Sequence, residues 1–393
     1  MGQIIIIKDN LKTLKNLNVL FLTLFKKDSQ KRNTKQKLIK KTKSFTFIMD
    51  KQLDFFNNLE QIQNLEWFGK YGKNFKKVGK WAINWNRQVL QNVGGYYSEE
   101  EYKIGLWKEL NKNYCSYIPV FEEGEYYDDK KIGKWKYLQK NGNMYYFTGI
   151  ISGGGYYKDD LKKIGKWIEL QEDFWSDAQV TYQGEYNVKG MKIGLWDINY
   201  CDKNQQNYQQ VGGGSYNQEG QKKIGKWVEL WEKFRSDAKV IYHGEYDIKG
   251  MKTGMWEIKY YQKNEQQYQQ IGGGTYDQEG IKIGKWIELD EGFWGNKQVT
   301  YNGEYNIKGM KKGRWDILFE GRLIGGGFYS QQGIKFGRWV ELGEGFHIWA
   351  QIIYNGEYNT NGMKIGRWAF VFEGKQMQIF FNYWNQFQWW WII

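Results

Sequence analysis

The chain has 393 residues, of which 19% are aromatic, 48 are glycine and one is proline. Many aromatic residues and glycines, with almost no proline, are typical of short strands joined by tight turns. The low mean hydropathy argues against a membrane-embedded chain. The two cysteines, Cys115 and Cys201, form no CxxC pair. This excludes a disulfide framework and a cysteine zinc site, and it favours a reducing, cytoplasmic location.

The net charge of +13 is concentrated at the amino-terminal end. Residues 1–49 carry twelve Lys or Arg against two Asp, a net +10, which leaves +3 for the rest. A nearly neutral body argues against nucleic acid as a partner of the whole chain.

Residues 1–49 are predicted to be a basic leader, poorly ordered or helical. An alternative is that this segment contacts an anionic membrane surface, and the candidate contact residues are Lys26, Lys27, Lys31, Arg32 and Lys35. A third interpretation is that translation starts at Met49. Residues 50–67 are assigned to an N-terminal cap segment.

Internal repeats fill residues 68–370. They are of two kinds that alternate, as in GGGTYDQEGIKIGKWIEL (272–289) and TYQGEYNVKGMKIGLWDI (181–198). Both kinds share a tyrosine followed by Lys-x-Gly-x-Trp, and with a degenerate copy at 68–83 there are eleven units. A tryptophan anchors each unit: Trp81, Trp107, Trp135, Trp167, Trp196, Trp227, Trp256, Trp286, Trp315, Trp339 and Trp368.

Each unit is predicted to be a β-hairpin. In residues 178–187, alanine, valine, tyrosine and glycine alternate with polar residues, which is the period of a half-buried strand. In the return strand, Gly194, Trp196 and Ile198 share one face. In units of the first kind, Trp227 shares its face with Glu229, so the pattern leaves open which face is buried. The predicted fold is all-β: an elongated antiparallel β-solenoid, or single curved sheet, of about eleven hairpins.

Glycines recur two residues before the aromatic anchors. A ring that lies over a strand glycine recovers stability that the glycine costs. The predicted structural anchors, besides the tryptophans, are therefore Tyr186, Tyr246, Tyr305, Tyr358, Gly184, Gly194, Gly244 and Gly254.

No catalytic constellation is found, and no enzyme activity, cofactor or metal is expected. His243 and His347 occupy positions that other residue types hold in sister repeats. The Gly-Gly-Gly runs lead into a tyrosine and a strand, which favours a turn or bulge over a phosphate cradle. Repeated glutamates are expected to form cross-strand pairs with Lys166, Lys226, Lys285 and Arg338. These glutamates are Glu169, Glu229, Glu288 and Glu341 after the tryptophan, and Glu185, Glu245, Glu304 and Glu357 after the glycine.

Residues 371–393 are assigned to an aromatic C-terminal cap or helix. Phe380, Tyr383, Trp384, Phe387 and Trp391 have helical spacing. The first interpretation is a cap that packs on the last hairpin. The alternative is a helix that lies at a membrane surface or in the groove of a partner.

The segment Tyr182–Tyr186, followed by Gly190, Gly194 and Trp196, resembles the core of MORN repeats. The resemblance covers roughly residues 68–370. The units are longer than usual MORN units and end in Gly-x-Trp, which is similar to the MORN-like variant of bacterial antitoxin-type repeat proteins and of uncharacterised protist repeat proteins. The resemblance implies an antiparallel β-solenoid with a role in scaffolding, dimerisation or attachment to membrane and cytoskeleton. It implies no reaction.

Three functions follow as hypotheses. The first is a non-enzymatic scaffold that binds an unidentified protein partner. The second is peripheral attachment to membrane or cytoskeleton through the basic N-terminal segment. The third, single-stranded RNA binding, requires exposed rows of aromatic rings on which bases stack. Self-association remains open.

Overall fold

The computed structural model describes residues 58–139, 153–158, 161–174, 176–202, 205, 207–372 and 375–379. The chain separates into two units, Met1–Gln63 and Asn64–Ile393. In the first unit, the described residues are Asn58 and the helix α3 (Leu59–Asn64) up to Gln63. The hairpin array belongs to the second unit and starts at Leu65.

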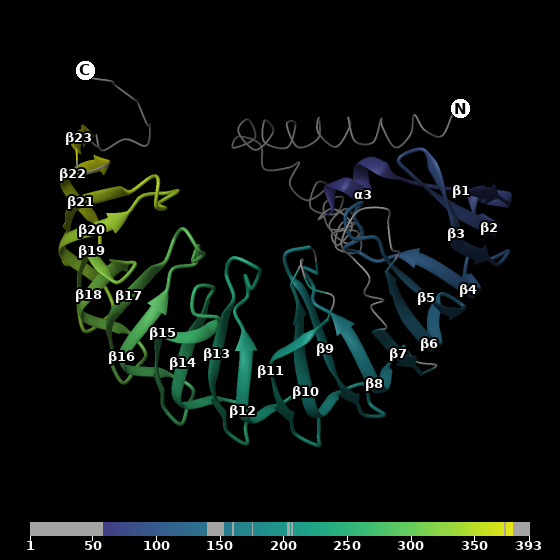
Figure 1. Ribbon diagram of the computed structural model, residues 1–393, viewed down its shortest axis with the longest axis horizontal. Helices are drawn as coiled ribbons and strands as arrows, with labels where there is room; N and C mark the ends of the chain where they lie inside the picture. The colour runs from purple at the N-terminus through teal and green to yellow at the C-terminus, as the bar shows by residue number, and fades with distance from the viewer. Residues whose placement is uncertain are drawn as a thin grey trace, which may run out of the picture. The chain divides into compact units, whose positions relative to one another are not determined.

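Within the described residues, the second unit holds 23 strands in one sheet. Each strand pairs antiparallel with the next strand in the chain, so the strands follow one another along an open, curved sheet (Figure 1). A short 3₁₀-helix, η2 (Lys73–Phe75), lies between the first two strands.

The strands are β1 (Leu65–Tyr71), β2 (Lys77–Trp85), β3 (Gln88–Tyr97), β4 (Lys103–Leu110), β5 (Val120–Tyr127), β6 (Lys130–Gln139), β7 (Gly153–Tyr157), β8 (Lys163–Leu170), β9 (Gln179–Tyr186), β10 (Lys192–Cys201), β11 (Gln209–Tyr216), β12 (Lys223–Leu230), β13 (Val240–Tyr246), β14 (Lys252–Gln262), β15 (Gln267–Tyr276), β16 (Lys282–Leu289), β17 (Val299–Tyr305), β18 (Lys311–Phe319), β19 (Arg322–Tyr329), β20 (Lys335–Leu342), β21 (Ile352–Tyr358), β22 (Lys364–Phe372) and β23 (Lys375–Ile379).

The all-β, single curved sheet predicted from the repeats is confirmed, and each of the eleven units is one hairpin. Because consecutive strands are antiparallel, the short turns that close the hairpins lie along one edge of the sheet. We call this the turn edge. The connections between hairpins lie along the opposite edge, which we call the loop edge.

Most of the turns share one construction. In the β9–β10 turn, the Asn187 side-chain oxygen accepts hydrogen bonds from the backbone N–H groups of Lys189 and Met191, both at 3.0 Å. Gly190 has φ +79°, a left-handed conformation that glycine adopts without strain. Side chains of Asn and Asp commonly hold a turn in this way, and the hydroxyls of Ser98 and Ser330 accept the equivalent bonds in their turns.

The loop edge explains why two kinds of hairpin alternate. A long loop follows β4, β8, β12, β16 and β20, and these loops stack on one another. Ser236 donates its N–H to the carbonyl of Asp177 (2.8 Å), and Gly295 donates to that of Asp237 (3.0 Å). Polar contacts between successive long loops join residues 58 to 60 positions apart. The true period of the structure is therefore a pair of hairpins.

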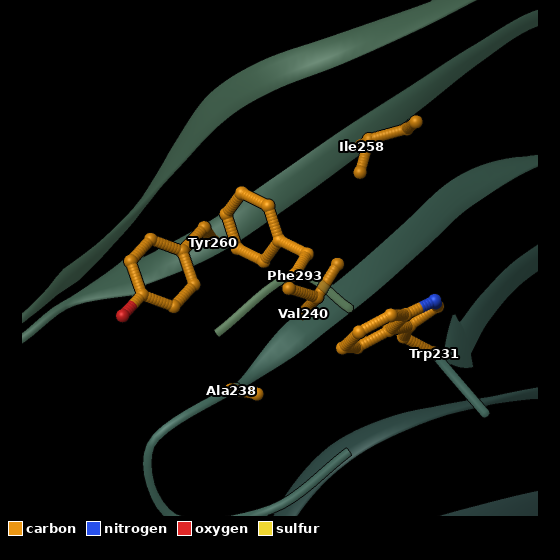
Figure 2. Close-up of a cluster of buried hydrophobic side chains, with 6 residues drawn as sticks. All are labelled: Trp231, Ala238, Val240, Ile258, Tyr260 and Phe293. Carbon is orange, nitrogen blue, oxygen red and sulfur yellow. The ribbon is translucent and has the colours of Figure 1, made fainter. Parts of the chain in front are cut away.

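Each of the long loops after β8, β12, β16 and β20 inserts a phenylalanine between itself and the sheet, and the loop after β4 inserts Tyr114. Figure 2 shows one such cluster, in which the Phe293 ring lies beside Tyr260, with Val240 and Trp231 next to it. The ring centroids of Phe293 and Tyr260 are 5.4 Å apart in an edge-to-face arrangement. The equivalent phenylalanines are at most 3% exposed: Phe174, Phe234, Phe293 and Phe346. The loops thus form a second layer over the loop-side half of the sheet.

The strict alternation predicted for residues 178–187 holds only in part. Ala178 and Val180 are buried as expected, but Gln179 is also buried at 2% exposure. Its side chain lies close to the carbonyl of Ser176, at 3.5 Å, in the long loop. The long loop therefore buries Gln179, although the period-2 pattern places this residue on the solvent-exposed face.

The C-terminal segment begins as a strand. Lys375–Ile379 form β23, which pairs with β22 in a register that sets Trp368 opposite Ile379. The backbone of these five residues therefore continues the sheet. Phe380, Tyr383, Trp384, Phe387 and Trp391 lie outside the described residues.

Candidate functional site

One face of the sheet carries the tryptophan anchors, each placed over a glycine of the same hairpin. A Cβ built on Gly184 would lie 2.3 Å from the Trp196 ring, and one on Gly244 would lie 2.2 Å from Trp256. The role predicted for these two glycines is therefore confirmed. The same arrangement recurs in both kinds of hairpin, at the pairs Gly69–Trp81, Gly95–Trp107, Gly124–Trp135, Gly155–Trp167, Gly214–Trp227, Gly274–Trp286, Gly303–Trp315, Gly327–Trp339 and Gly356–Trp368.

Gly194 and Gly254 have a different role from the one predicted. A Cβ at either position would meet no atom within 4 Å, so no ring lies over them. Their φ angles are +61° and +64°, and the register of each hairpin shifts at this point. These glycines form a bulge in the return strand. Lys-x-Gly-x-Trp is thus a conformational motif, and only the glycine of the first strand lies beneath the ring.

Tryptophan and tyrosine rings alternate along this face in a continuous aromatic ladder. The Trp227 and Tyr246 centroids are 6.3 Å apart, and those of Tyr246 and Trp256 are 5.3 Å apart, both edge-to-face. The indole N–H of Trp256 donates to the carbonyl of Glu245 at 3.2 Å. All eleven anchoring tryptophans are 3% exposed or less. The ladder is therefore a packed core built along a single sheet.

Clusters of lysine and glutamate cover the ladder. Glu229 forms ion pairs with Lys223 and Lys252 and accepts a hydrogen bond from the hydroxyl of Tyr246 at 2.8 Å. The Nζ of Lys252 also lies 3.8 Å from the centroid of the Trp256 ring, a cation–π contact. The same cluster recurs around Glu169, Glu288 and Glu341, with the hydroxyls of Tyr186, Tyr305 and Tyr358.

These clusters correct the expected ion pairs. Glu229 was expected to pair with residues such as Lys226, but it lies two positions after Trp227 and shares the ladder face. The structure thereby settles which face of the first-kind return strand is buried. Lys226 instead lies opposite Glu245 in the register, as expected for the glutamates that follow the glycine. Equivalent pairs of positions are Lys166 and Glu185, Lys285 and Glu304, and Arg338 and Glu357.

The clusters change the ionisation of their members. Burial by itself would raise the pKa of Glu229, but the charges and hydrogen bonds of Lys223 and Lys252 outweigh it, so the pKa lies below its usual range. Burial and the nearby carboxylates raise the pKa of Tyr216 to about 12. Near neutral pH the glutamate is therefore ionised and the tyrosine is neutral. Neither group has the pKa of a general acid or base that works at that pH.

A groove of about 650 Å³ lies on the ladder face, bounded by strands β8 to β12 and the first residues of two long loops. Glu172, Asp173 and Glu232 line it on the loop side, and Lys192 and Lys223 line it on the ladder side. Both lysines already form ion pairs with glutamates of the clusters. The groove offers a polar and aromatic contact surface, and no nucleophile lies beside a free base in it.

The other singled-out residues also have structural roles. His243 lies 3.3 Å from Glu257 at the sheet surface, and His347 forms a bridge with Ala350 inside a long loop. In the Gly-Gly-Gly runs, a Cβ on Gly273 would lie 2.1 Å from the carbonyl oxygen of Trp256, and φ is +127°. The run is a bulge, as predicted. Among the described residues, no group of three His, Cys, Asp or Glu could hold a metal ion.

The face opposite the ladder, which we call the back face, carries exposed apolar side chains. The side chain of the residue before each tryptophan points to the back face, because successive side chains of a strand point to opposite faces of the sheet. Leu106, Leu195 and Met255 are 69%, 65% and 62% exposed. In sister strands the same position holds lysine or arginine, as at Lys226 and Lys285.

The proposed membrane-contact residues Lys26, Lys27, Lys31, Arg32 and Lys35 lie outside the described residues. In the described part of the chain, no helix is long and apolar enough to cross a membrane. Comparison with models of known families and with curated proteins finds no match for this sequence.

Proposed function

We propose that the protein is a non-enzymatic scaffold of MORN-like repeats that binds a protein partner on the back face of its sheet. The observation that carries the proposal is the set of exposed apolar residues in register on that face. Leu195 and Met255 occupy the same position in β10 and β14, four strands apart, which is about 19 Å at 4.8 Å per strand.

Ionic positions separate these apolar sites. Between them, the register sets Lys226 of β12 opposite Glu245 of β13. Apolar contacts flanked by charged groups resemble the composition of protein interfaces, where apolar anchors supply affinity and charges supply register. Farther along the sheet, Phe328 and Phe336 lie 6.2 Å apart and are 43% and 37% exposed. They extend the apolar pattern of the back face.

Catalysis is not part of the proposal. The groups that could carry charge chemistry recur in hairpin after hairpin, and each glutamate is matched by lysines and a tyrosine hydroxyl. A role in holding lysine chains over the ladder accounts for every member of the cluster. RNA binding is not proposed either, because the anchoring tryptophans are covered and offer no face for a base.

The test compares the full chain with the double variant Leu195→Lys and Met255→Lys. Lysine is the residue that sister strands carry there, so the variant is expected to fold. Burying each side chain at an interface contributes about 1.5–3 kcal/mol, so the variant should lose partner binding at least about tenfold. The measurement is quantitative capture of interacting proteins from cell extract by both forms, followed by binding assays with each recovered protein. Equal binding by both forms would refute a back-face site.

A second candidate, peripheral membrane attachment, is favoured by the charge distribution alone. Residues 1–49 hold +10 of the +13 net charge, and clustered cations near a membrane contribute roughly 1 kcal/mol each on an anionic surface. We expect salt-sensitive binding of the full chain to vesicles that contain phosphatidylserine. Deletion of residues 1–49 should abolish this binding. If the deleted form binds equally well, the basic segment is not the attachment site.

A further inference from the structure

In four lysine–glutamate clusters of the ladder, one hairpin supplies the carboxylate and the next hairpin supplies two of its donors. The ammonium of Lys192 lies 2.9 Å from the carboxylate of Glu169, and the hydroxyl of Tyr186 donates a hydrogen bond to it at 2.7 Å. Tyr186 and Lys192 stand directly opposite each other in the β9–β10 hairpin. The same opposed pair holds the glutamate of the preceding strand in three further hairpins, as Tyr246 and Lys252, Tyr305 and Lys311, and Tyr358 and Lys364.

The first hairpin of the array carries the same pair of donors. Tyr71 of β1 stands opposite Lys77 of β2, and the two residues are six positions apart, as in the sister hairpins. The centroids of the Tyr71 and Trp81 rings are 5.0 Å apart in an edge-to-face arrangement. Trp81 in turn lies over Gly69 of its own hairpin. The first hairpin thus reproduces the donor side of a cluster.

These two donors have no carboxylate to bind. Within the described residues, the Lys77 ammonium forms no ion pair and the Tyr71 hydroxyl donates no hydrogen bond. Glu101 accepts a hydrogen bond from the backbone N–H of Lys77 at 3.2 Å. The Nζ atom lies 5.0 Å from the centroid of Trp81 and 5.5 Å from that of Tyr97. Burial lowers the pKa of Lys77, although the charge of Glu101 opposes this effect. Lys77 is therefore a half-buried cation whose carboxylate partner is missing from this part of the chain.

The position of β1 explains why the carboxylate is missing. In a sister hairpin, Glu169 reaches the donor pair because β8 lies beside β9, in a register that places Glu169 opposite Tyr182. In the described part of the chain, β1 pairs with β2 alone, so its other edge is unpaired. This edge is open to solvent, because Tyr71 is 39% exposed whereas Tyr186 is 9% exposed. A strand that pairs with this edge would supply the missing carboxylate, as β8 does for β9.

The register of the sister strands specifies what that strand must carry. Trp67 occupies in β1 the place that Tyr182 occupies in β9, and Gly69 likewise corresponds to a glycine of β9. An antiparallel strand would therefore place its acidic residue opposite Trp67 and the residue two positions earlier opposite Gly69. In β8 that earlier residue is Trp167, which stands opposite Gly184. Side chains two positions apart point to the same face, so the acidic side chain lies on the ladder face beside the donor pair.

We propose that the free edge of β1 binds an extended acidic segment of a partner protein, whose carboxylate is held by Lys77 and Tyr71. The segment pairs antiparallel with β1 and carries glutamate two positions after an aromatic residue. Backbone hydrogen bonds align it, as in other proteins that add a strand to a sheet edge. Charge-assisted hydrogen bonds to the carboxylate select it over neutral segments. The site lies on the first strand of the array, so it does not depend on the proposed function of the back face.

Calorimetric titration of the full chain with a synthetic peptide tests the site. The peptide copies residues 223–230, KIGKWVEL, in which glutamate stands two positions after tryptophan. Its ends are blocked, so this glutamate is its only carboxylate. A matched peptide carries glutamine in place of the glutamate. The glutamate peptide should bind at least about tenfold more tightly, because hydrogen bonds to a charged group are stronger than neutral ones by such a factor.

Variants of the donor pair locate the interaction. In Lys77→Met, the glutamate and glutamine peptides should bind with equal affinity. In Tyr71→Phe, the preference for glutamate should be smaller than in the unaltered chain. The matched control is Lys80→Met, because Lys80 is an exposed lysine of the same strand that points to the back face. It should retain the full preference. The variant Leu195→Lys, Met255→Lys should also retain it, which separates this site from the back-face site.

A second measurement uses the unaltered chain. The glutamate peptide should slow acylation of the Lys77 amine by an N-hydroxysuccinimide ester, as followed by mass spectrometry. The glutamine peptide at the same concentration should slow it less. Failure of the glutamate peptide to bind, or equal affinity for the two peptides, would overturn the proposal. So would a preference for glutamate that persists in Lys77→Met, or an acylation rate that the glutamate peptide leaves unchanged.

Discussion

Substitution of Gly244 by alanine tests whether the ladder depends on bare backbone beneath its rings. The new Cβ would lie 2.2 Å from Cδ2 of Trp256, whereas carbon atoms pack at about 3.5 Å. The ring would have to move by roughly 1.3 Å. It cannot move freely, because Tyr246 and Tyr276 flank it at 5.3 and 6.1 Å and its N–H is bonded to the carbonyl of Glu245.

The expected cost follows from these contacts. Overpacking of a filled core costs about 1–3 kcal/mol, and a weakened indole hydrogen bond adds about 1 kcal/mol. Removing a strand glycine returns about 0.5–1 kcal/mol. The net destabilisation is therefore about 1–3.5 kcal/mol, which moves a urea midpoint by about 1 M at ordinary m-values.

Urea denaturation followed by tryptophan fluorescence measures this change. The matched control is Gly295→Ser, since the sister loop carries Ser236 at that position and the nearest atom to a Cβ there is 3.5 Å away. The control should move the midpoint little. If Gly244→Ala were as stable as the control, the Trp256 ring would have an alternative position. The inference that the ladder requires a glycine beneath each tryptophan would then be wrong.

Three further outcomes are expected. Folding lowers the pKa of Glu229, so its cluster stabilises the protein above about pH 4.3 and loses this contribution as pH falls. In Glu229→Gln, the free energy of unfolding should therefore fall less steeply as the pH is lowered. An unchanged pH dependence in the acid range would contradict the ion pairs. The pKa of Tyr216 is about 12, so folding is stabilised below pH ~10 and weakened above it; absorbance titration should show Tyr216→Phe losing a late-titrating group. Phe234→Ala removes a buried ring from the loop layer and should cost about 3–5 kcal/mol, measured by guanidinium denaturation, whereas the exposed Tyr117→Ala should cost little.

The stability of this fold is distributed over neighbouring hairpins. Each tryptophan contacts the tyrosine before it and the tyrosine after it, and each lysine–glutamate cluster joins strands of two hairpins. Repeat proteins of this type are stabilised mainly by such nearest-neighbour contacts. Loss of one rung should therefore destabilise its neighbours more than distant hairpins.

The sequence by itself determined the fold class and the limits of the hairpins, because the period of two within strands and the recurring Gly-x-Trp are local signals. It also identified Gly184 and Gly244 as sites beneath a ring. It did not distinguish these two glycines from Gly194, because a glycine beneath a ring and a glycine in a bulge both stand two positions before an aromatic residue in the sequence. Their φ angles and neighbours distinguish them.

Only the tertiary structure decided the rest. Glu229 joins Lys223 and Lys252 because a bulge and the pairing of strands bring residues of different hairpins together, and spacing within one unit does not show this. Phe234 becomes core because loops about 60 residues apart stack on one another. The turns of the hairpins form one row only because the meander places every second connection on the same side of the sheet. The local sequence pattern sets each hairpin, and contacts between hairpins decide which faces of the sheet are buried and which are exposed.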